Sequence, residues 1–576
     1  MPHPDNTQKF KKIAQNYWDY YLQSFPEVAT FYGNSKYDDL LEEFGPDKRE
    51  KDKDAISGFL KDLQSIEPST LNNLDSNSYR ILKLDLNNFL EEHEFAPWEW
   101  NIDQIYGPHM RLLDLLETHP LQTRKNYDDL LERYSHIPRY FMQYIGELKA
   151  GLKSGRTASK IAYDRVLKQL EEFLKKNIRD LHFSKPIRDF PKDFSPSEKS
   201  KLTEEFEDAI RSWILPSYAE FYNFLKTDYQ DKARKNPGIW ALPEGLENYA
   251  FKCRQMTTTN LTPAELHKIG LEELQKNNEE ILSIASKMGN DSGLPQFLDR
   301  IKKDPAQYFK TSEEIVTMHQ TALQRMQKLL PQYFGTLPTI PFEIKEIDAF
   351  KALNSPAAFY YPPTTDGSRP GVFWVNTHNP SQWAIYSMET LAYHEAIPGH
   401  HFQIALAMEN KDLPLFQRHG AFTAYVEGWA HYTERIANEE MNAYSSDLQR
   451  VGMLLDQAWR AVRLVVDTGV HHFQWSREKA FEFMKSTRAA HEMEMNNEID
   501  RYIVWPGQAL AYKVGQRTFS DLKNKAKQKL GAAFDIRKFH DAVLLQGAMP
   551  LFILEEIVDL WIGSQIVGKQ SSQIQP

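Results

Sequence analysis

The sequence predicts a mainly α-helical protein with a small β-sheet next to one histidine-rich helix. Apolar residues recur at helical spacing along most of the 576 residues. Several of these runs begin with Ser or Thr three residues before Glu, which is the signature of a helix N-terminus. Strand-like patterns are confined to two short segments, 342–347 and 372–376, just before the histidines.

Three long scaffold helices are expected, at 198–226, 263–288 and 312–330. Their capping boxes are Ser195 with Glu198, Thr262 with Glu265, and Thr311 with Glu314. In the first two, proline occupies the first helical position, where its missing N–H has no cost. The aromatic stripes of these helices indicate core packing.

Breaks between helices are expected at 45–54, 183–196 and 236–245, and the polar tail after Gly568 is expected to be disordered. We interpret residues 1–240 as an N-terminal helical region and residues 241–576 as the region that carries the functional site. Large helical enzymes often form one continuous body, and we expect that here.

The composition excludes some classes of protein. Apolar residues make up 41% of the chain, enough for a substantial core. The net charge of −10 gives no reason to expect nucleic acid and favours neutral or basic peptides as partners. The longest apolar stretch, 542–554, is too short and broken to cross a bilayer. We therefore expect no transmembrane segment.

The compartment and the oligomeric state stay open. A single cysteine, Cys253, allows no internal disulfide. The first residues, MPHPDN, contain no apolar signal region. A cytoplasmic protein and an exported protein whose leader has been removed both agree with this start.

The segment HEAIPGHH, from His394 to His401, is the main chemical signal. In the helical motif HExxH two histidines four residues apart face one metal ion, and the glutamate between them faces the bound water. Here six residues separate His394 from His400, which on a regular helix places them on different faces. Pro398 and Gly399 favour a bulge. If two residues loop out, His400 takes the second ligand position, although His401 remains an alternative.

A second helix is expected at 421–441, after a turn at 410–414 that lets the chain double back. It carries Glu427, the predicted third ligand. An ordinary i, i+4 pair of Glu427 with His431 is the alternative. His431 and Glu434 lie on the same helix face and either orient the ligands or are solvated surface residues.

Two imidazoles and a carboxylate suit Zn²⁺, the predicted cofactor, although manganese and cobalt accept the same set. A degenerate or purely structural histidine cluster is the alternative. In the catalytic interpretation Glu395 is the general base that takes a proton from the water activated by the metal.

These motifs resemble a known family. HEAIPGHH, the later EGWAHY at 427–432 and RYIVWPGQALAY at 501–512 resemble the family called domain of unknown function 885. The resemblance covers most of the chain and implies a zincin-like zinc metallopeptidase of the gluzincin type, with two histidines and one glutamate on the metal. His431 stands where the family pattern has leucine, so its role cannot come from the resemblance.

Further site residues are expected around this centre. Tyr512 and then Tyr502 are candidates for the donor to the developing oxyanion, because both lie in the segment that resembles the family's third motif. Both could instead be core aromatics. Arg501 and Lys513 are candidates for binding a substrate carboxylate, or are salt-bridge partners.

Asn376 and His378 precede the metal helix and are candidates for contacts with the substrate backbone. A strand edge near the metal could hold an extended peptide, although a small structural hairpin is the alternative. The resulting prediction is a zinc-dependent peptide hydrolase. A metal-dependent hydrolase of a non-peptide amide or ester, and a non-catalytic metal-binding relative, remain alternatives. The site of cleavage along a peptide is not predicted.

Overall fold

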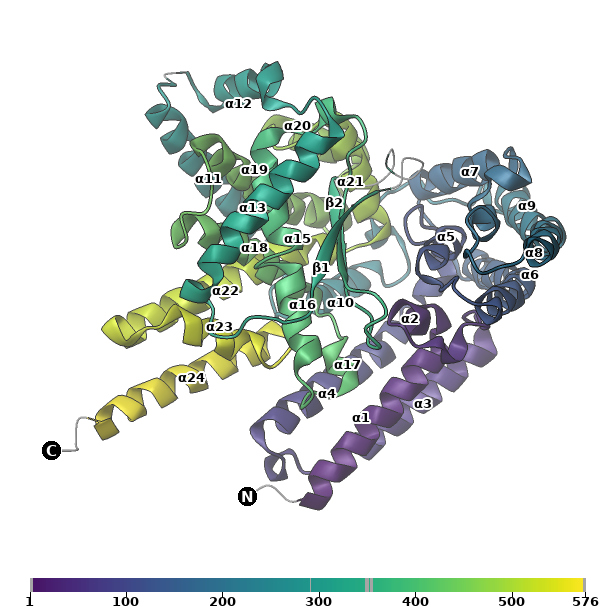
Figure 1. Cartoon of the computed structure of the whole chain (residues 1–576), viewed down its shortest axis with the longest axis horizontal. Helices are drawn as coiled ribbons and strands as arrows, with labels where there is room; N and C mark the ends of the chain where they lie inside the picture. The colour runs from purple at the N-terminus through teal and green to yellow at the C-terminus, as the bar shows by residue number, and fades with distance from the viewer. Residues whose placement is uncertain (1–3, 291, 348–351, 353–355, 573–576) are drawn as a thin grey trace.

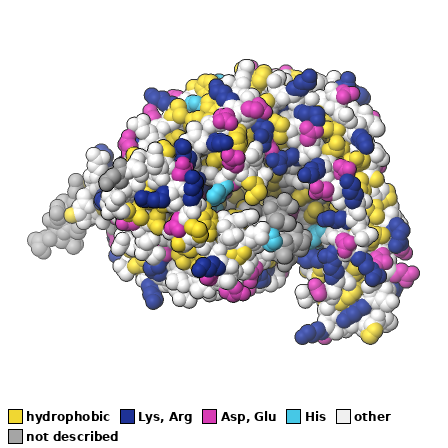
Figure 2. Space-filling view, turned by 90° about the horizontal axis from the view of Figure 1, so that it is seen from above, with side chains coloured by type: hydrophobic (Ala, Val, Ile, Leu, Met, Phe, Trp, Pro, Cys, Tyr) yellow, Lys and Arg dark blue, Asp and Glu magenta, His cyan; other side chains and the backbone are white. Residues whose placement is uncertain are grey.

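The computed structural model describes all residues except 1–3, 291, 348–351, 353–355 and 573–576. The described chain is mainly α-helical with one three-stranded β-sheet, as predicted. Figure 1 shows the helices of the second half gathered around the sheet, and helices of the first half alongside. On the face shown in Figure 2, charged side chains of both signs are interspersed and the surface is hollowed near its middle.

The first half contains two groups of helices. One group lies beside the second half of the chain and comprises α1 (Pro4–Ser24), α2 (Pro26–Phe31), α3 (Pro46–Gln64) and α4 (Asn73–His93). The other forms a separate cluster and comprises α5 (Pro108–Thr118), α6 (Arg124–Ser154), α7 (Lys160–Leu174), α8 (Pro196–Ala209) and α9 (Leu215–Phe224). The helix predicted at 198–226 is α8 and α9, joined through a π-helical turn.

The second half contains the helices that surround the sheet. In chain order they are α10 (Gly245–Thr257), α11 (Pro263–Lys287), α12 (Leu294–Lys303), α13 (Ser312–Tyr333), α15 (Met388–Glu395), α16 (His400–Glu409), α17 (Leu415–Arg418), α18 (Thr423–Glu439), α19 (Asp447–His471), α20 (Arg477–Thr487), α21 (Glu492–Val504), α22 (Ala511–Leu530), α23 (Ile536–Leu544) and α24 (Leu551–Ser572). The helices predicted at 263–288, 312–330 and 421–441 are therefore confirmed as α11, α13 and α18, within a few residues at each end.

The buried apolar residues form two large clusters. The first joins residues 10–100 to residues 239–562, and the second lies within residues 41–233. The regions 1–240 and 241–576 thus share a core through the N-terminal helices α1 to α4. The predicted capping boxes at Ser195, Thr262 and Thr311 are all present.

Two predicted irregular segments are helical. The charged run 45–54 is not a break, because α3 begins at Pro46 and buries Ile56 and Leu63. Charges along a helix face are compatible with solvent exposure, and Lys48 pairs with Asp52 one turn later. At the other end α24 continues to Ser572, so the prediction of disorder after Gly568 is wrong for 569–572. Residues 573–576 lie outside the described residues.

The sheet has the order β1 (Phe342–Glu346), β3 (Gly371–Val375) and β2 (Ala358–Tyr361). The two predicted strands, β1 and β3, are confirmed, and they pair in parallel. They are therefore not a hairpin. The strand that the sequence did not predict, β2, pairs antiparallel to β3 and forms an edge of the sheet next to α15. Its residues AFYY carry no alternation of polar and apolar residues.

Helices α18 and α22 cross at two glycines. A Cβ on Gly515 would lie 1.8 Å from the Ala424 carbonyl oxygen, and a Cβ on Gly428 would lie 2.4 Å from the Gly515 Cα. The backbones therefore touch at this crossing, which fits the prediction that another backbone comes close to Gly428. The contact fixes the position of α22 against the helix that carries Glu427.

Gly515→Ala is expected to destabilise the protein by about 2–4 kcal/mol, because the added methyl group must push two helix backbones apart. Urea unfolding followed by circular dichroism measures this. Gly146→Ala is the matched control, since Gly146 lies on an exposed helix position with nothing within 4 Å of an added Cβ. That control is expected to be neutral or slightly stabilising, and equal losses for both variants would contradict the close-contact argument.

No described helix is long and apolar enough to span a membrane.

Candidate metal centre

The helix that carries the histidine motif is interrupted after Glu395. Helix α15 ends at Glu395, and α16 begins at His400. Across the interruption the Phe402 N–H donates to the Ala396 carbonyl oxygen at 3.3 Å. This bond reaches six residues back, where a regular helix reaches four. Two residues therefore loop out, which is the arrangement that the Pro–Gly pair predicted.

The loop is held in place by its glycine and by α18. A Cβ on Gly399 would lie 1.9 Å from the His394 carbonyl oxygen, so a side chain cannot be accommodated without movement of the backbone. Trp429 of α18, which is fully buried, donates its indole N–H to the Pro398 carbonyl oxygen at 2.8 Å. The same helix that supplies Glu427 therefore fixes the loop between the two histidines.

The structure brings the three predicted ligands together. Glu427 Oε2 lies 3.5 Å from Nε2 of His394 and 3.5 Å from Nε2 of His400. One donor atom from each of the three side chains lies within 4.8 Å of the others. Helix α18 packs against α15 and α16 and so delivers the carboxylate to the two imidazoles, as the turn at 410–414 predicted.

The donor atoms fit a divalent metal ion. A tetrahedral ion with ligand bonds of about 2.0–2.2 Å holds neighbouring ligand atoms about 3.3–3.6 Å apart, and the two 3.5 Å separations lie in that range. Glu427 Oε2 is buried and has no hydrogen-bond partner among the described residues. A buried carboxylate oxygen without a partner is unfavourable. A cation between these atoms would satisfy it.

The charges of the ligands depend on one another. Burial alone lowers the pKa of His394, but the carboxylates of Glu427 and Glu434 outweigh it and raise that pKa to about 10. Burial alone raises the pKa of Glu427, but His394 and His400 hold it well below its usual range. A bound ion would take the place of a proton on these ligands.

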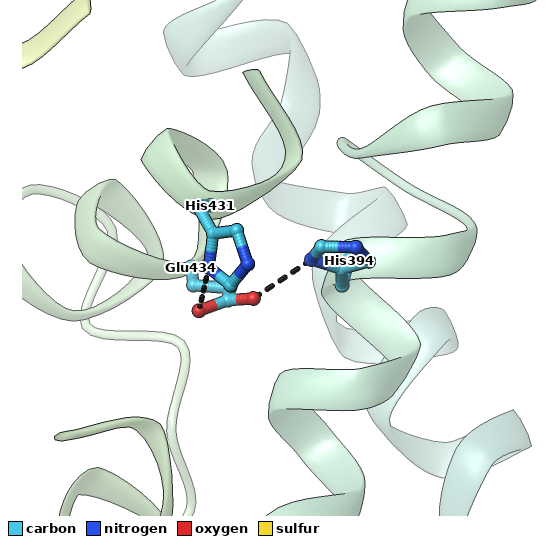
Figure 3. A group of neighbouring side chains, drawn as sticks. All are labelled: His394, His431 and Glu434. Carbon is cyan, nitrogen blue, oxygen red and sulfur yellow. Dashed lines mark hydrogen bonds and ion pairs between the residues drawn. The ribbon is translucent and has the colours of Figure 1, made fainter. Parts of the chain in front are cut away.

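Glu434 orients His394. Its Oε1 accepts a hydrogen bond from Nδ1 of His394 at 2.8 Å, and its Oε2 lies 3.0 Å from Nδ1 of His431 (Figure 3). With Nδ1 engaged, His394 presents Nε2 to the centre. His394, His431 and Glu434 also lie close enough to form a metal-binding group, but these hydrogen bonds already account for their contacts.

His431 and Glu434 are not solvated surface residues. Their exposed fractions are 1% and 0%. Because Nδ1 of His431 bonds to Glu434, the alternative pair of His431 with Glu427 is not formed. Nε2 of His431 is buried without a hydrogen-bond partner among the residues described. Gln457 of α19 completes the group by donating to Glu434 Oε2 at 2.8 Å.

His401 faces away from the centre. Its Nδ1 accepts a hydrogen bond from the Tyr360 hydroxyl at 2.8 Å, and its Nε2 lies 3.0 Å from the Ile340 carbonyl oxygen. Both ring nitrogens thus connect α16 to the sheet region. His400 and His401 are consecutive residues of α16, and the side chains of consecutive residues in an α-helix point about 100° apart. The open choice between the two histidines is therefore decided in favour of His400.

Glu395, the predicted base, is the last residue of α15. It is 9% exposed, and its charge helps to raise the pKa of the adjacent His394. Among the described residues none donates a hydrogen bond to its carboxylate. An acceptor in this position is available to a water molecule or a substrate.

The two candidate tyrosines lie in different surroundings. The Tyr512 ring lies 5.8 Å from the His431 ring, and its hydroxyl oxygen accepts a hydrogen bond from Gln508 at 3.2 Å. Burial and the charge of Glu427 raise the pKa of Tyr512, so its hydroxyl keeps its proton at neutral pH. The Tyr502 hydroxyl already donates to Glu498 at 2.8 Å. Tyr512 is thus the one placed beside the candidate ligands.

Both predicted cations have partners inside the protein. Lys513 is buried, and its ammonium group donates to Gln457 at 2.7 Å and to Gln516 at 3.1 Å. Burial lowers the pKa of Lys513 to about 7. Arg501 forms two hydrogen bonds with the Glu498 carboxylate, at 2.9 and 3.0 Å. The structure therefore gives both side chains structural partners.

The residues before the metal helix are also partly engaged. Asn376 is 2% exposed and donates its amide to the Ala352 carbonyl oxygen at 2.7 Å, which shapes the loop after β3. His378 is half-buried, and its backbone carbonyl accepts the Trp383 indole N–H. Contacts of either residue with a substrate stay a prediction.

Sequence reasoning missed the contribution of α19. Gln457 and Arg463 lie on this helix, and Arg463 pairs with Glu498 of α21 at 2.9 Å. The signal was present, because charged and polar residues recur at helical spacing within a largely apolar run between Leu454 and Val470. Polar residues on a buried helix face require partners, and so mark a polar interior.

The fold and the centre define a large helical protein with a cluster of two histidines and one glutamate. Residues 26–558 match the family described as bacterial protein of unknown function, DUF885, and the chain belongs to that family. This confirms the resemblance noted in the sequence. No curated protein matches the chain.

Two solved structures are similar. A candidate lipoprotein from Colwellia psychrerythraea is 26% identical, with a TM-score of 0.91 over 97% of this chain and 99% of that one. A candidate lipoprotein of unknown function from Shewanella oneidensis is 18% identical, with a TM-score of 0.73 over 95% of this chain and 99% of that one. The second likeness concerns the fold alone.

Proposed function

We propose that this protein is a zinc-dependent peptide hydrolase of the gluzincin type, with His394, His400 and Glu427 as the metal ligands. The observation that carries the proposal is the convergence of two imidazole nitrogens on one carboxylate oxygen, at 3.5 Å each, where that buried oxygen has no other partner in the described chain. Glu395 follows His394 at the end of α15, and its charge acts on the His394 imidazole. A zincin-like arrangement on an interrupted helix explains all of these positions.

A bound zinc ion would supply a Lewis acid that polarises the substrate carbonyl and acidifies a water molecule. Glu395 would act as the general base, taking a proton from the attacking water and passing it to the leaving amine. Its carboxylate is suited to this because no described residue donates a hydrogen bond to it. Glu434 keeps the imidazole of His394 in one orientation throughout, through the 2.8 Å hydrogen bond to Nδ1.

Tyr512 is the proposed donor to the developing oxyanion. Its hydroxyl oxygen accepts from Gln508, which leaves its own proton for another acceptor. Because its pKa is raised, the hydroxyl is protonated at neutral pH and can donate. Tyr502 is the weaker of the two predicted tyrosines, since its proton is committed to Glu498.

An extended peptide is the proposed substrate. Strand β2 forms one edge of the sheet and packs next to α15, the helix that carries His394 and Glu395. The free edge of a strand offers N–H and C=O groups that bind an extended chain by β-augmentation. The substrate would then lie along β2 with a peptide bond at the centre.

Purified protein loaded with zinc is expected to cleave members of a mixed peptide pool, detected by mass spectrometry. Treatment with 1,10-phenanthroline should abolish cleavage and added zinc should restore it, whereas the non-chelating isomer 1,7-phenanthroline should have no effect. Hydrolysis of non-peptide amides or esters with intact peptides would favour the alternative hydrolase. Zinc binding without hydrolysis of any of these would favour a non-catalytic relative.

A further inference from the structure

Helix α19 carries a stripe of charged residues through the interior, next to the metal centre. Asp456, Arg460, Arg463 and Asp467 follow one another at intervals of four, three and four residues, and so share one helix face. The rest of the helix is largely apolar and buried. A buried charged stripe is costly unless each group has a partner, so its unpartnered atoms are informative.

Among the described residues of the stripe, Arg460 leaves only Nε without a hydrogen-bond partner, whereas Arg463 leaves two nitrogens. Arg463 is 8% exposed, and its Nη2 pairs with Glu498 at 2.9 Å. Its Nε and Nη1 are buried and have no hydrogen-bond partner among the described residues. A guanidinium group is a fork of donors that binds carboxylates with high geometric specificity. The free side of this fork is therefore a ready site for an anion.

Arg463 has no acid of its own as an ion-pair partner in the described chain, because Asp467, the next acid of the stripe, accepts from Tyr249 and from the Gly507 N–H instead. Arg463 and Arg501 share a single carboxylate, that of Glu498. Arg460 is neutralised by Asp456 at 2.7 Å. Glu494 is a further acid close by, but no ion pair in the described part of the chain joins it to these arginines, and burial raises the pKa of its carboxyl to about 7. A buried guanidinium that shares its one paired carboxylate with a second arginine favours an anionic ligand.

Tyr512 connects Arg463 to the metal centre. The Arg463 guanidinium lies over the Tyr512 ring, 4.4 Å from its centroid. The same ring lies 5.8 Å from His431, whose ring lies 4.8 Å from that of His394. Arg463 is therefore separated from the ligands by the proposed oxyanion donor and one histidine. A peptide that places its carbonyl at the centre can place a group a short distance along the chain at Arg463.

We propose that Arg463 binds the free C-terminal carboxylate of the substrate, so that the enzyme removes residues from the carboxyl end of peptides. This inference rests on the proposed peptide hydrolase function and adds its substrate class. It replaces Arg501 and Lys513 as receptors for that carboxylate, because the donors of both are used by Glu498, Gln508, Gln457 and Gln516. Nε and Nη1 of Arg463 are therefore the donors that remain for the substrate carboxylate.

A pair of peptides tests the inference on the wild-type enzyme. The two have the same sequence, and one ends in a free carboxylate while the other ends in an amide. The zinc-loaded wild-type protein is expected to cleave the acid with a kcat/KM at least about tenfold above that of the amide, because only the acid carries the charge that Arg463 binds. Equal kcat/KM values for the two peptides would overturn the inference, and this comparison needs no variant.

Variants assign the preference to Arg463. Arg463→Gln is expected to lower kcat/KM for the acid by about tenfold or more, down to the value for the amide, and to leave the amide within about twofold, so that the preference disappears. Arg463→Lys keeps the positive charge but not the planar set of guanidinium donors, so this variant should retain part of the preference for the acid. Arg435→Gln is the matched control, because Arg435 pairs with Glu280 and Glu439 instead. A preference that survives in Arg463→Gln would overturn the assignment.

Binding separates this inference from the proposed function. Isothermal titration of the chelator-treated protein with the same peptides is expected to show tighter binding of the acid, lost in Arg463→Gln. If neither peptide is cleaved but this difference is measured, the hydrolase proposal fails and the carboxylate site stands. If both peptides are cleaved alike, or if neither is cleaved and both bind alike, the carboxylate site fails.

Discussion

Glu395→Gln is expected to lower kcat for peptide cleavage by on the order of 10²–10⁴, with the bound zinc unchanged. Glutamine has nearly the same shape but cannot accept the proton of the attacking water. Because Glu395 ends α15 and no described residue donates to its carboxylate, the exchange breaks no observed hydrogen bond. Cleavage of a defined peptide, sampled at fixed times after the reaction is stopped, gives kcat, and atomic absorption gives the zinc content.

Two further variants complete this experiment. Glu395→Asp keeps a carboxylate but withdraws it by one methylene, so part of the activity should remain. Glu272→Gln removes an exposed carboxylate on α11 and should have no effect. Wild-type kcat in Glu395→Gln would show that another group takes the proton, and the proposed mechanism would be wrong.

His400→Ala is expected to abolish stoichiometric zinc binding and, with it, peptide cleavage. The variant leaves only His394 and Glu427 on the ion, and two ligands do not hold zinc at micromolar protein concentration against competing chelators. Competition with a fluorescent chelator measures the affinity. Glu434→Gln should lose less, about 10–100-fold, because it disturbs only the orientation of His394.

The neighbouring histidine is the control for this prediction. His401→Gln is expected to retain zinc, since both nitrogens of His401 bond to Tyr360 and Ile340 rather than facing the centre. Retention of zinc by His400→Ala together with its loss in His401→Gln would reverse the ligand assignment and contradict the structure at the start of α16.

The local parts of the fold followed from the sequence. The capping boxes located the starts of α8, α11 and α13, because Ser or Thr and a Glu three residues later satisfy free N–H groups in any context. The charged run before Ile56 was misread as a break, since the side of a helix that faces solvent tolerates any charge pattern. Strand β2 was missed because its four residues are stabilised by pairing with β3, a contact distant in the chain.

The candidate ligands were also readable from the sequence. The spacing of His394 and His400 requires two residues to loop out of the helix, and Pro398 followed by Gly399 favours such a bulge. Glu427 followed from a helix that could fold back after a turn. These inferences involve residues within about one helical hairpin, where spacing and backbone chemistry restrict the possible geometries.

The roles of the outer residues depended on the tertiary structure. Local spacing offers an acid to Arg501, at Glu498, and to Arg463, at Asp467, but only the first of these pairs is formed among the described residues. Arg501 pairs with Glu498 within α21, and Lys513 donates to Gln516 within α22, but the packing of α19 against these helices adds Gln457 to Lys513, brings Arg463 to Glu498, and leaves two nitrogens of Arg463 without partners. Hydrogen bonds between distant segments decide which charges are satisfied. Local sequence can therefore specify the metal-binding motif, whereas only the assembled interior determines which cation remains available to a ligand.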